Sequence, residues 1–415
     1  MRAILKQAKN FFSAKFYRPS HLRIAVRDYF DLRAPQQALQ PNAVHVAAAM
    51  SWLCAAQDAS PDGGVSARYR LDHGWAPSYP ETSGYIIPTF FSYAHSVSAA
   101  ESRERALRIA DWLLSLQFDT GAFPGHDVGK APQPIVFNTG QIMLGLLSAF
   151  RETGHRKYLR AAIRAGDWLV QIQEPNGSWL QHTYLNRVHT YHTRVAWPLL
   201  ELWEATGNEQ YLNTARKHLD WALGNQLANG WFRENGFSDN ENPYLHTIAY
   251  TTRGFLASAE ILRKHAIAGE QAERYFAAAV LASEALLHRF EVRRFPFAKY
   301  NREWQSPERY SCLTGDAQLA KTWLNIYQVN RDPRFLNAAL KINDFVKSTQ
   351  DLSSRNPGIR GGIKGSHPIW ARYMRFSYPN WAAKFFVDAL RLEDEITSQL
   401  DREIEDEPRL VVQVA

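Results

Sequence analysis

The feature that most constrains the fold of this chain is a sequence motif, called here the repeat, that recurs along its length. The first half reads as a helix that ends in Trp, Gln and a Gly-containing turn, as in DWLLSLQFDTGAF from 111, DWLVQIQEPNGSW from 167 and DWALGNQLANGWF from 220. The second half opens on Thr or Asn and continues as an apolar helix, as in NTGQIMLGLLSAF from 138. It occurs six times, at spacings of 54 to 66 residues, around Gly84, Gly140, Arg194, Arg253, Gly315 and Trp381. Such repetition predicts six copies of one helix pair.

Helical periodicity supports this interpretation. Between 156 and 173, apolar residues recur every three or four positions, while Arg160, Arg164 and Asp167 share another face. The amphipathic member of each pair is the expected outer helix, near 44–58, 103–117, 157–173, 211–226, 270–288 and 334–349. No run of alternating β-branched residues is bounded by hairpin turns, so the sequence predicts an all-α fold.

The connections differ in length. Inner-to-outer links are short turns, whereas outer-to-inner links run to about 20 to 30 residues, which is long for a compact domain. In a ring of helix pairs all the long links leave from the same end. The sequence therefore predicts an (α/α)6 toroid of six helical hairpins with long loops on one face. The amino ends of the inner helices would surround a funnel there, and their unsatisfied N–H groups would attract anions.

Charge divides the 415 residues into three parts: a basic N-terminal extension over 1–40, the toroid over 41–395 and an acidic C-terminal tail over 396–415. Residues 1–33 carry a local charge of +6 and residues 393–415 a local charge of −6, so the part between keeps the overall +7. A composition of 45% hydrophobic and 21% charged residues allows a large core and excludes a disordered or fibrous chain.

No apolar run approaches the roughly 20 residues of a membrane-spanning helix, and the start lacks the apolar region of a secretory signal. We therefore expect a cytoplasmic protein. The basic start with Phe11, Phe12, Phe16 and Tyr17 allows peripheral contact with an anionic inner membrane, but a helix packed on the ring is the favoured interpretation.

Cofactor motifs are missing. The sequence holds no GxSxG, GxxxxGK[ST], GxGxxG or HExxH pattern. His182, His189 and His192 share one segment without metal-site spacing, and we expect no metal and no cofactor. The two cysteines, Cys54 and Cys312, fit no disulfide framework.

Side chains at the six inner-helix starts are candidates for one site. Removal of the C5 proton of a uronic acid requires a base, a proton donor and groups that neutralise the carboxylate. In this hypothesis His192 is the base, Tyr250 or Tyr191 is the acid, and Arg194 neutralises charge with Asn138 or Gln141. The alternative is that these residues are hydrogen-bonded wall residues or, for Thr and Asn, helix caps.

The expected partner is an acidic polysaccharide or oligosaccharide. From 353 to 387 the chain has no acid, and 289–302 is also basic, so both loops would form a positive rim. No nucleic-acid-binding signature accompanies this charge. The residues expected to bind the sugar are Tyr79, Gln141, His246, Arg253, Asp316, Lys364, Arg372 and Trp381.

These motifs resemble known toroids. RAGDWLVQIQEPNGSW, from 164, is similar to the glutamine–tryptophan repeat of triterpene cyclases and prenyltransferase-type toroids, although their DxDD motif is absent. DGGV, SYPETSGY, TGQIMLGLLSAF and TYHTR resemble the helical domain of glucuronyl C5-epimerases. That resemblance implies that Tyr79, Glu81, Tyr191 and His192 are site residues. Residues 40–395 also resemble toroidal polysaccharide-biosynthesis proteins of bacterial exopolysaccharide clusters.

The leading hypothesis is an enzyme of exopolysaccharide metabolism that abstracts the C5 proton of a uronic-acid polymer, as a polysaccharide lyase or C5-epimerase. One alternative is a glycoside hydrolase, which would need two carboxylates across the funnel, Glu81 and Asp316. Another is a glycan-binding toroid without catalysis.

Overall fold

The computed structural model describes residues 12, 14–31, 39–293 and 296–406. In this part of the chain twelve helices form six hairpins. The outer helices are α3 (Asn42–Asp58), α5 (Ala100–Leu114), α7 (Arg156–Gln171), α9 (Glu209–Gly224), α11 (Gly269–Arg293) and α13 (Pro333–Thr349). The inner helices are α4 (Pro80–Val97), α6 (Val136–Thr153), α8 (Thr193–Thr206), α10 (Leu245–Lys264), α12 (Leu313–Asn330) and α14 (Asn380–Asp406).

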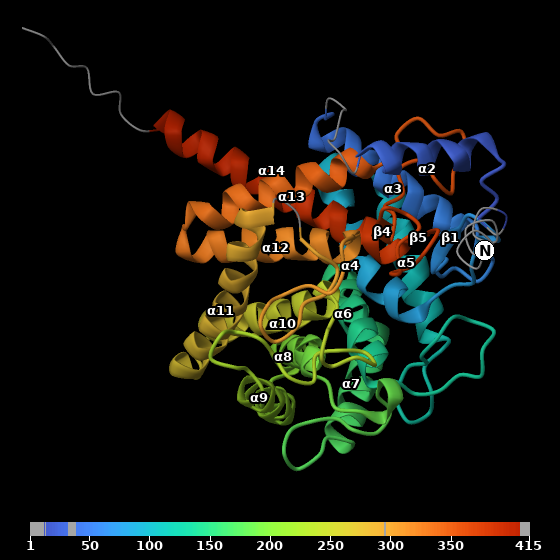
Figure 1. Ribbon diagram of the computed structural model, residues 1–415. Helices are drawn as coiled ribbons and strands as arrows, with labels where there is room; N and C mark the ends of the chain where they lie inside the picture. Colours follow the sequence, from blue (N-terminus) through green and yellow to red (C-terminus); the bar gives the residue numbers. More distant parts are fainter. Residues whose placement is uncertain (1–11, 13, 32–38, 294–295, 407–415) are drawn as a thin grey trace, which may run out of the picture.

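The ring is closed. Each inner helix contacts the next, and α14 returns to contact both α3 and α4 (Figure 1). The predicted six-hairpin, mainly helical toroid is thereby confirmed. Inner helices are buried nearly all round, whereas α7 buries one face and exposes Arg160, Arg164 and Asp167 on the other. The apolar and amphipathic patterns in the sequence thus separate the inner layer from the outer one.

The Gln and Gly residues that recur in the repeat make the same structural contact. The Nε2 atom of Gln117 donates to the carbonyl oxygen of Gly121 in its own turn (2.9 Å) and to that of Ala161 in α7 (2.8 Å). Each such glutamine therefore ties a turn to the next outer helix. The same pair of bonds is made by Gln57, Gln173 and Gln226.

A fifth glutamine closes the outer layer. Gln350, at the end of α13, donates to the carbonyl oxygen of Gly361 (2.7 Å) and to that of His45 in α3 (3.3 Å). The last outer helix is in this way joined to the first by the same contact that joins earlier neighbours. Buried amide groups that bond two carbonyls satisfy backbone acceptors that would otherwise be costly to bury.

The long loops contain short strands that the sequence did not predict. β1 (Arg68–Arg70) pairs antiparallel with β2 (Gly74–Trp75) and with β5 (Ser377–Pro379), and β3 (Ser311–Cys312) pairs with β4 (Ser366–His367). Strands of two or three residues are too short to show an alternating pattern. Through β1 and β5, the first long loop is joined to the last one.

The basic N-terminal segment contributes α2 (Pro19–Asp31), which lies beside the loop between α13 and α14 (Figure 1). Asp28 and Lys364 form an ion pair in which both side chains are buried. The backbone N–H of Ile369 also donates to Asp28 (2.7 Å). At the other end of the chain α14 continues through 396 as far as Asp406; Phe11 and residues 407–415 lie outside the described part.

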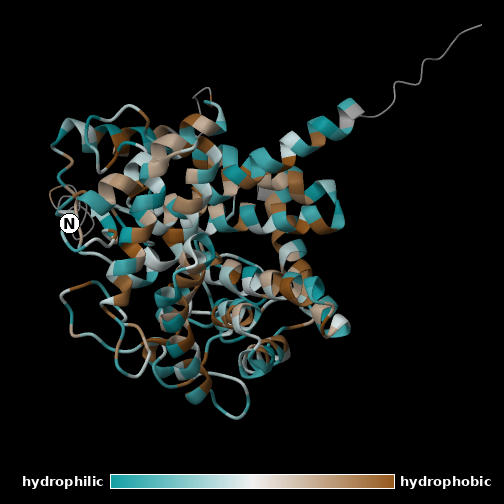
Figure 2. Cartoon of the chain, turned by 180° about the vertical axis from the view of Figure 1, so that it is seen from behind, coloured by the Kyte–Doolittle hydropathy of each residue, from teal (hydrophilic) through white to brown (hydrophobic). Residues whose placement is uncertain are grey.

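Hydrophilic and hydrophobic residues are interspersed along the helices (Figure 2). None of the helices in the described ranges combines the length and apolarity that crossing a bilayer requires. Phe16 is buried and its ring lies 5.4 Å from that of Phe376, whereas Phe12 and Tyr17 are exposed.

Candidate functional site

The inner helices surround a channel with a cavity toward each end. The cavity at their amino ends, called here the amino-end cavity, has a volume of about 420 Å³. Ten aromatic side chains line it: Tyr79, Tyr85, Phe137, Tyr184, Tyr191, Phe237, Tyr244, Tyr250, Tyr373 and Trp381. A concave, largely aromatic wall with a few polar groups is typical of a small-molecule site.

Glu81 provides the acid of this cavity. It lies in the first turn of α4, and among the described lining residues it is the only carboxyl group. The hydroxyl of Tyr79 donates to its Oε2 atom across 2.7 Å. Burial raises the pKa of Glu81 to about 7, against the opposing effects of the Tyr79 hydrogen bond and the charge of Arg194. Near neutral pH this carboxyl group can therefore both give and take a proton.

Asn138 and His246 are further polar groups that line the cavity. Asn138 donates to the carbonyl oxygen of Pro124 (3.3 Å). The Nδ1 atom of His246 accepts from Nε2 of Gln318 (2.8 Å), and burial lowers the pKa of His246 to about 3. The imidazole is therefore neutral, and its remaining proton is on Nε2.

A layer of side chains separates the two cavities. The rings of Tyr85 and Phe385 lie 5.4 Å apart, and those of Tyr250 and Phe385 6.1 Å apart. The guanidinium of Arg194 stands over the Tyr250 ring at 5.2 Å, and its N–H groups donate to Oε1 of Gln141. Tyr250 lines the amino-end cavity, whereas Arg194 and Phe385 line the other one.

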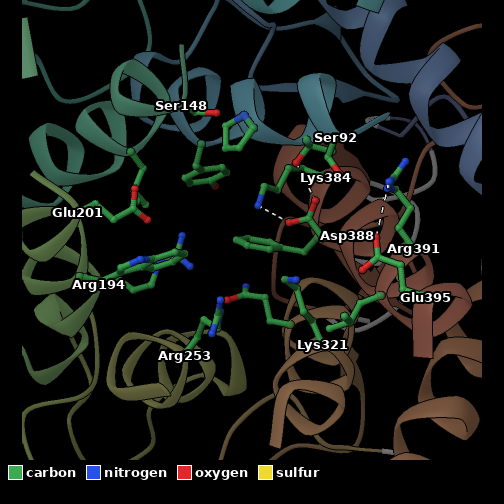
Figure 3. Close-up of a pocket in the computed structure, with 18 of the residues that line it drawn as sticks. Ser92, Ser148, Arg194, Glu201, Arg253, Lys321, Lys384, Asp388, Arg391 and Glu395 are labelled. Atoms are coloured by element: carbon green, nitrogen blue, oxygen red, sulfur yellow. Dashed lines mark hydrogen bonds and ion pairs between the residues drawn. The ribbon is translucent and has the colours of Figure 1, made fainter. Parts of the chain in front are cut away.

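The second cavity, called here the carboxyl-end cavity, has a volume of about 310 Å³ (Figure 3). Its wall is charged rather than aromatic. The basic side chains are Arg151, Arg194, Arg253, Lys321, Lys384 and Arg391, and the acidic ones are Glu201, Asp388 and Glu395.

The predicted site residues divide among three places. Those that line the amino-end cavity are Tyr79, Glu81, Asn138, Tyr191, His246, Tyr250 and Trp381. Arg194 and Arg253 line the carboxyl-end cavity. Gln141, His192, Asp316, Lys364 and Arg372 line neither.

The structure corrects the placement of His192, the predicted base. This residue ends the short 3-10 turn η2 (Thr190–His192), and its side chain is fully buried. Its ring packs near Phe137 (6.2 Å), Trp179 (6.1 Å) and His218 (6.1 Å). Tyr191 faces the cavity instead, because successive residues of a helical turn point in different directions.

Asp316 is also misplaced as the second carboxyl of a hydrolase pair. Its side chain is fully buried and lines neither cavity, and burial raises its pKa well above the ordinary value. The ammonium of Lys364 contacts Asp28 and His367, and this residue lines neither cavity. Arg372 is exposed and pairs with Glu308 (3.3 Å). Neither Lys364 nor Arg372 therefore lines a cavity as part of the expected positive rim.

The sequence reasoning missed most of the aromatic wall. Tyr184, Phe237, Tyr244 and Tyr373 come from three long loops, and Phe237 and Tyr244 share the loop between α9 and α10. The one sequence signal for these wall residues is that each long loop contains an aromatic residue, but the irregular spacing of these aromatic residues makes the signal hard to recognise. Among the described residues no three His, Cys, Asp or Glu side chains are grouped as around a metal ion.

Comparison with solved structures supports the fold. An unsaturated glucuronyl hydrolase specific for heparin is 14% identical over 85% of this chain and 97% of its own, with a TM-score of 0.66. Cellobiose 2-epimerase from Spirochaeta thermophila DSM 6192 is 13% identical over 92% and 99%, also with a TM-score of 0.66. The enzyme of that name from Bacillus thermoamylovorans B4167 is 12% identical over 83% and 96%, again with a TM-score of 0.66.

No curated protein matches the chain. A family model does: that of the β-L-arabinofuranosidase GH127 catalytic domain matches residues 46–277. The match runs from α3 into α11 and includes Glu81 and most of the aromatic wall. Because it spans more than half of the sequence, the chain belongs to the GH127 β-L-arabinofuranosidase catalytic-domain family of carbohydrate-active enzymes.

Proposed function

We propose that this chain is a glycoside hydrolase whose amino-end cavity holds a terminal sugar residue and whose Glu81 protonates the glycosidic oxygen. The observation that carries the proposal is a buried carboxyl group with a pKa of about 7 in an aromatic cavity. Membership of a glycoside hydrolase family supports the same reaction class.

The reaction needs one proton donor and one water. Glu81 gives its proton to the leaving oxygen as the bond from the anomeric carbon to that oxygen breaks, and the bond electrons stay with the oxygen. Water then adds to the anomeric carbon and returns a proton to Glu81. Hydrolases with two carboxylates place them about 5 to 9.5 Å apart. Since the described wall contains no second carboxyl, we assign both proton transfers to Glu81.

The wall favours an uncharged sugar. Among the described lining residues there is neither Lys nor Arg, and His246 is held neutral. The described wall therefore offers a uronate carboxylate neither a Lys nor an Arg partner. The name of the family makes L-arabinofuranosides the first substrates to test.

A second candidate is C5 proton abstraction from a uronic-acid-containing glycan, as a lyase or epimerase. The Tyr79–Glu81 pair favours it, because a carboxylate hydrogen-bonded to a phenol can take a proton that the phenol then replaces. Against it, the cation that would neutralise the enolate, Arg194, lines the other cavity.

A panel of nitrophenyl glycosides, including both anomers of L-arabinofuranose, and of uronate polymers separates these functions. Hydrolysis releases nitrophenol, a lyase creates a new C=C absorbance, and an epimerase incorporates solvent deuterium. We expect nitrophenol release that Glu81→Gln abolishes and that Arg334→Gln, an exposed change at the start of α13, preserves.

Nitrophenol release by a folded Glu81→Gln variant would contradict the assignment of Glu81 as the proton donor. Tight glycan binding without any product over long incubation would favour a binding protein.

A further inference from the structure

The carboxyl-end cavity carries more positive charge than its own carboxylates offset. Three ion pairs are formed across its wall: Lys384 with Asp388 (2.6 Å), Arg151 with Glu201 (2.7 Å), and Arg391 with Glu395 (3.8 Å). These pairs use every acidic side chain of the described wall.

Three cations remain: Arg194, Arg253 and Lys321. Within the described ranges none of them forms an ion pair, although the charge of Asp388 acts on both Arg253 and Lys321 from a greater distance. Arg194 and Arg253 both stand over the ring of Trp197, at 5.0 and 4.9 Å, and the Nε atom of Arg253 is buried without a hydrogen-bond partner. Figure 3 shows Arg253 and Lys321 extending into the cavity from neighbouring helices.

Three cations without ion-pair partners lower the stability of the folded protein while the cavity is empty. Removing a cation from water without a counter-charge opposes folding, which is why buried charges are normally paired. Burial accordingly lowers the pKa of Lys321 to about 8, so the ammonium is still mostly charged at pH 7. Helix dipoles do not compensate: Arg253 and Lys321 lie about two and a half to three turns before the carboxyl ends of α10 and α12, and the dipole acts within the last turn.

We propose that the carboxyl-end cavity binds a phosphate group, either free or carried by a small ester. Three cations from α8, α10 and α12 match a compact, doubly charged tetrahedral anion better than a single carboxylate, and the two guanidinium groups can each donate two parallel hydrogen bonds to it. The hydroxyl groups of Ser92 and Ser148 in the same wall supply further donors. A volume of about 310 Å³ leaves room for a small organic group on the phosphate.

This site is separate from the proposed sugar site. Tyr85, Phe385 and Arg194 stand between them, and the reaction assigned to Glu81 does not use the three cations. The two proposals can therefore fail independently.

Isothermal titration at constant ionic strength in chloride buffer tests the site, with inorganic phosphate and glucose 6-phosphate as probes. We expect saturable binding of at least one probe by the full-length protein. Arg253→Gln and Lys321→Gln should each weaken it at least tenfold, whereas Arg372→Gln, on the exposed surface, should leave it unchanged. Glu81→Gln should also retain it, which separates this site from the sugar site.

Stability supplies a second measurement, because removing an uncompensated cation should stabilise the empty protein. Lys321→Gln should raise the Tm in chloride and remove the rise that phosphate causes in the unaltered chain. Tighter binding of glucose 6-phosphate than of inorganic phosphate would assign the site to a phosphate ester. Equal or tighter binding of inorganic phosphate would assign the site to the free anion. Absence of saturable binding by either probe, or binding unchanged in folded Lys321→Gln and Arg253→Gln, would overturn the proposal.

Discussion

Tyr79 donates its phenolic hydrogen to the Oε2 atom of Glu81 across 2.7 Å. Tyr79 is the residue that precedes α4 and Glu81 is in its first turn, so one helix start positions both groups. Burial favours the protonated form of Glu81, while the hydrogen bond from Tyr79 favours the carboxylate. The balance between these two effects sets the pH range over which Glu81 can give a proton.

Tyr79→Phe should move the basic limb of the pH–activity profile to higher pH. The change keeps the ring in the wall and removes the hydrogen bond that stabilises the carboxylate, so the pKa of Glu81 rises further above its ordinary value. The limb should lie near pH 7 in the unaltered enzyme, because a general acid is lost as it deprotonates. Initial rates measured from pH 5 to 9 check this. A limb that stays in place or moves to lower pH would contradict the role of the pair.

Glu81→Gln should make the protein more stable at high pH. The folded pKa of about 7 is above the ordinary value of 4.5, so the unaltered protein loses stability relative to Glu81→Gln as the pH rises from about 4.5 through 7. The full difference is at most about 3.4 kcal/mol at 1.36 kcal/mol per pKa unit. Denaturant unfolding at pH 5 and pH 9 measures it. Glu270→Gln, at an exposed position, controls for the change in net charge; an equal effect at both pH values would refute the expectation.

His192→Ala should lower stability without removing turnover. The imidazole fills a fully buried space between Phe137, Trp179 and His218, and it lines neither cavity. Truncation of a buried ring to Ala typically costs about 3 to 5 kcal/mol. We expect kcat/KM per folded molecule to change by less than about tenfold, or ~1.4 kcal/mol. Complete loss of activity in a folded variant would restore His192 as a candidate base.

Gly177→Ala should destabilise the protein far more than Gly154→Ala. Both glycines have positive φ, at 90° and 69°. A Cβ atom on Gly177 would lie 2.4 Å from the carbonyl oxygen of Lys217 in α9, whereas one on Gly154 would meet nothing within 4 Å. The second variant should therefore cost only the backbone strain, about 1 to 2 kcal/mol. Thermal unfolding of the two variants compares them, and equal losses would show that close packing against α9 is unimportant.

Asp28→Ala should cost about 3 to 5 kcal/mol, because it leaves the buried ammonium of Lys364 without its carboxylate. It also removes the acceptor for the backbone N–H of Ile369. Glu308→Ala breaks the exposed pair with Arg372 and should cost less than about 1 kcal/mol. Denaturant unfolding gives both values. A small loss in Asp28→Ala would show that α2 contributes little to the stability of the ring.

The sequence predicted the ring because its information is local and repeated. Apolar periodicity separated inner from outer helices, and the Gln–Gly phrase marked the turns where Gln117 and Gln173 join neighbouring outer helices. Glu81, Tyr191 and Tyr250 were correctly expected at one funnel, because the starts of successive inner helices must meet there. These features depend on helix geometry and spacing, which the order of residues fixes.

Side-chain direction was decided by the tertiary structure. A shift of one position along a helical turn places Tyr191 in the wall of the amino-end cavity and His192 behind that wall. Arg194 and Arg253, in α8 and α10, line the carboxyl-end cavity, on the other side of the layer that contains Tyr250 and Phe385. The sequence suggested that Lys364 is a cation of the rim, but its side chain is buried beside Asp28, which is 336 residues away in the chain. Sequence alone determined that this chain forms six helical hairpins around a funnel. Because rotation about a helix axis and pairing over long sequence separations arise only from packing, the folded structure decided which charges face which cavity.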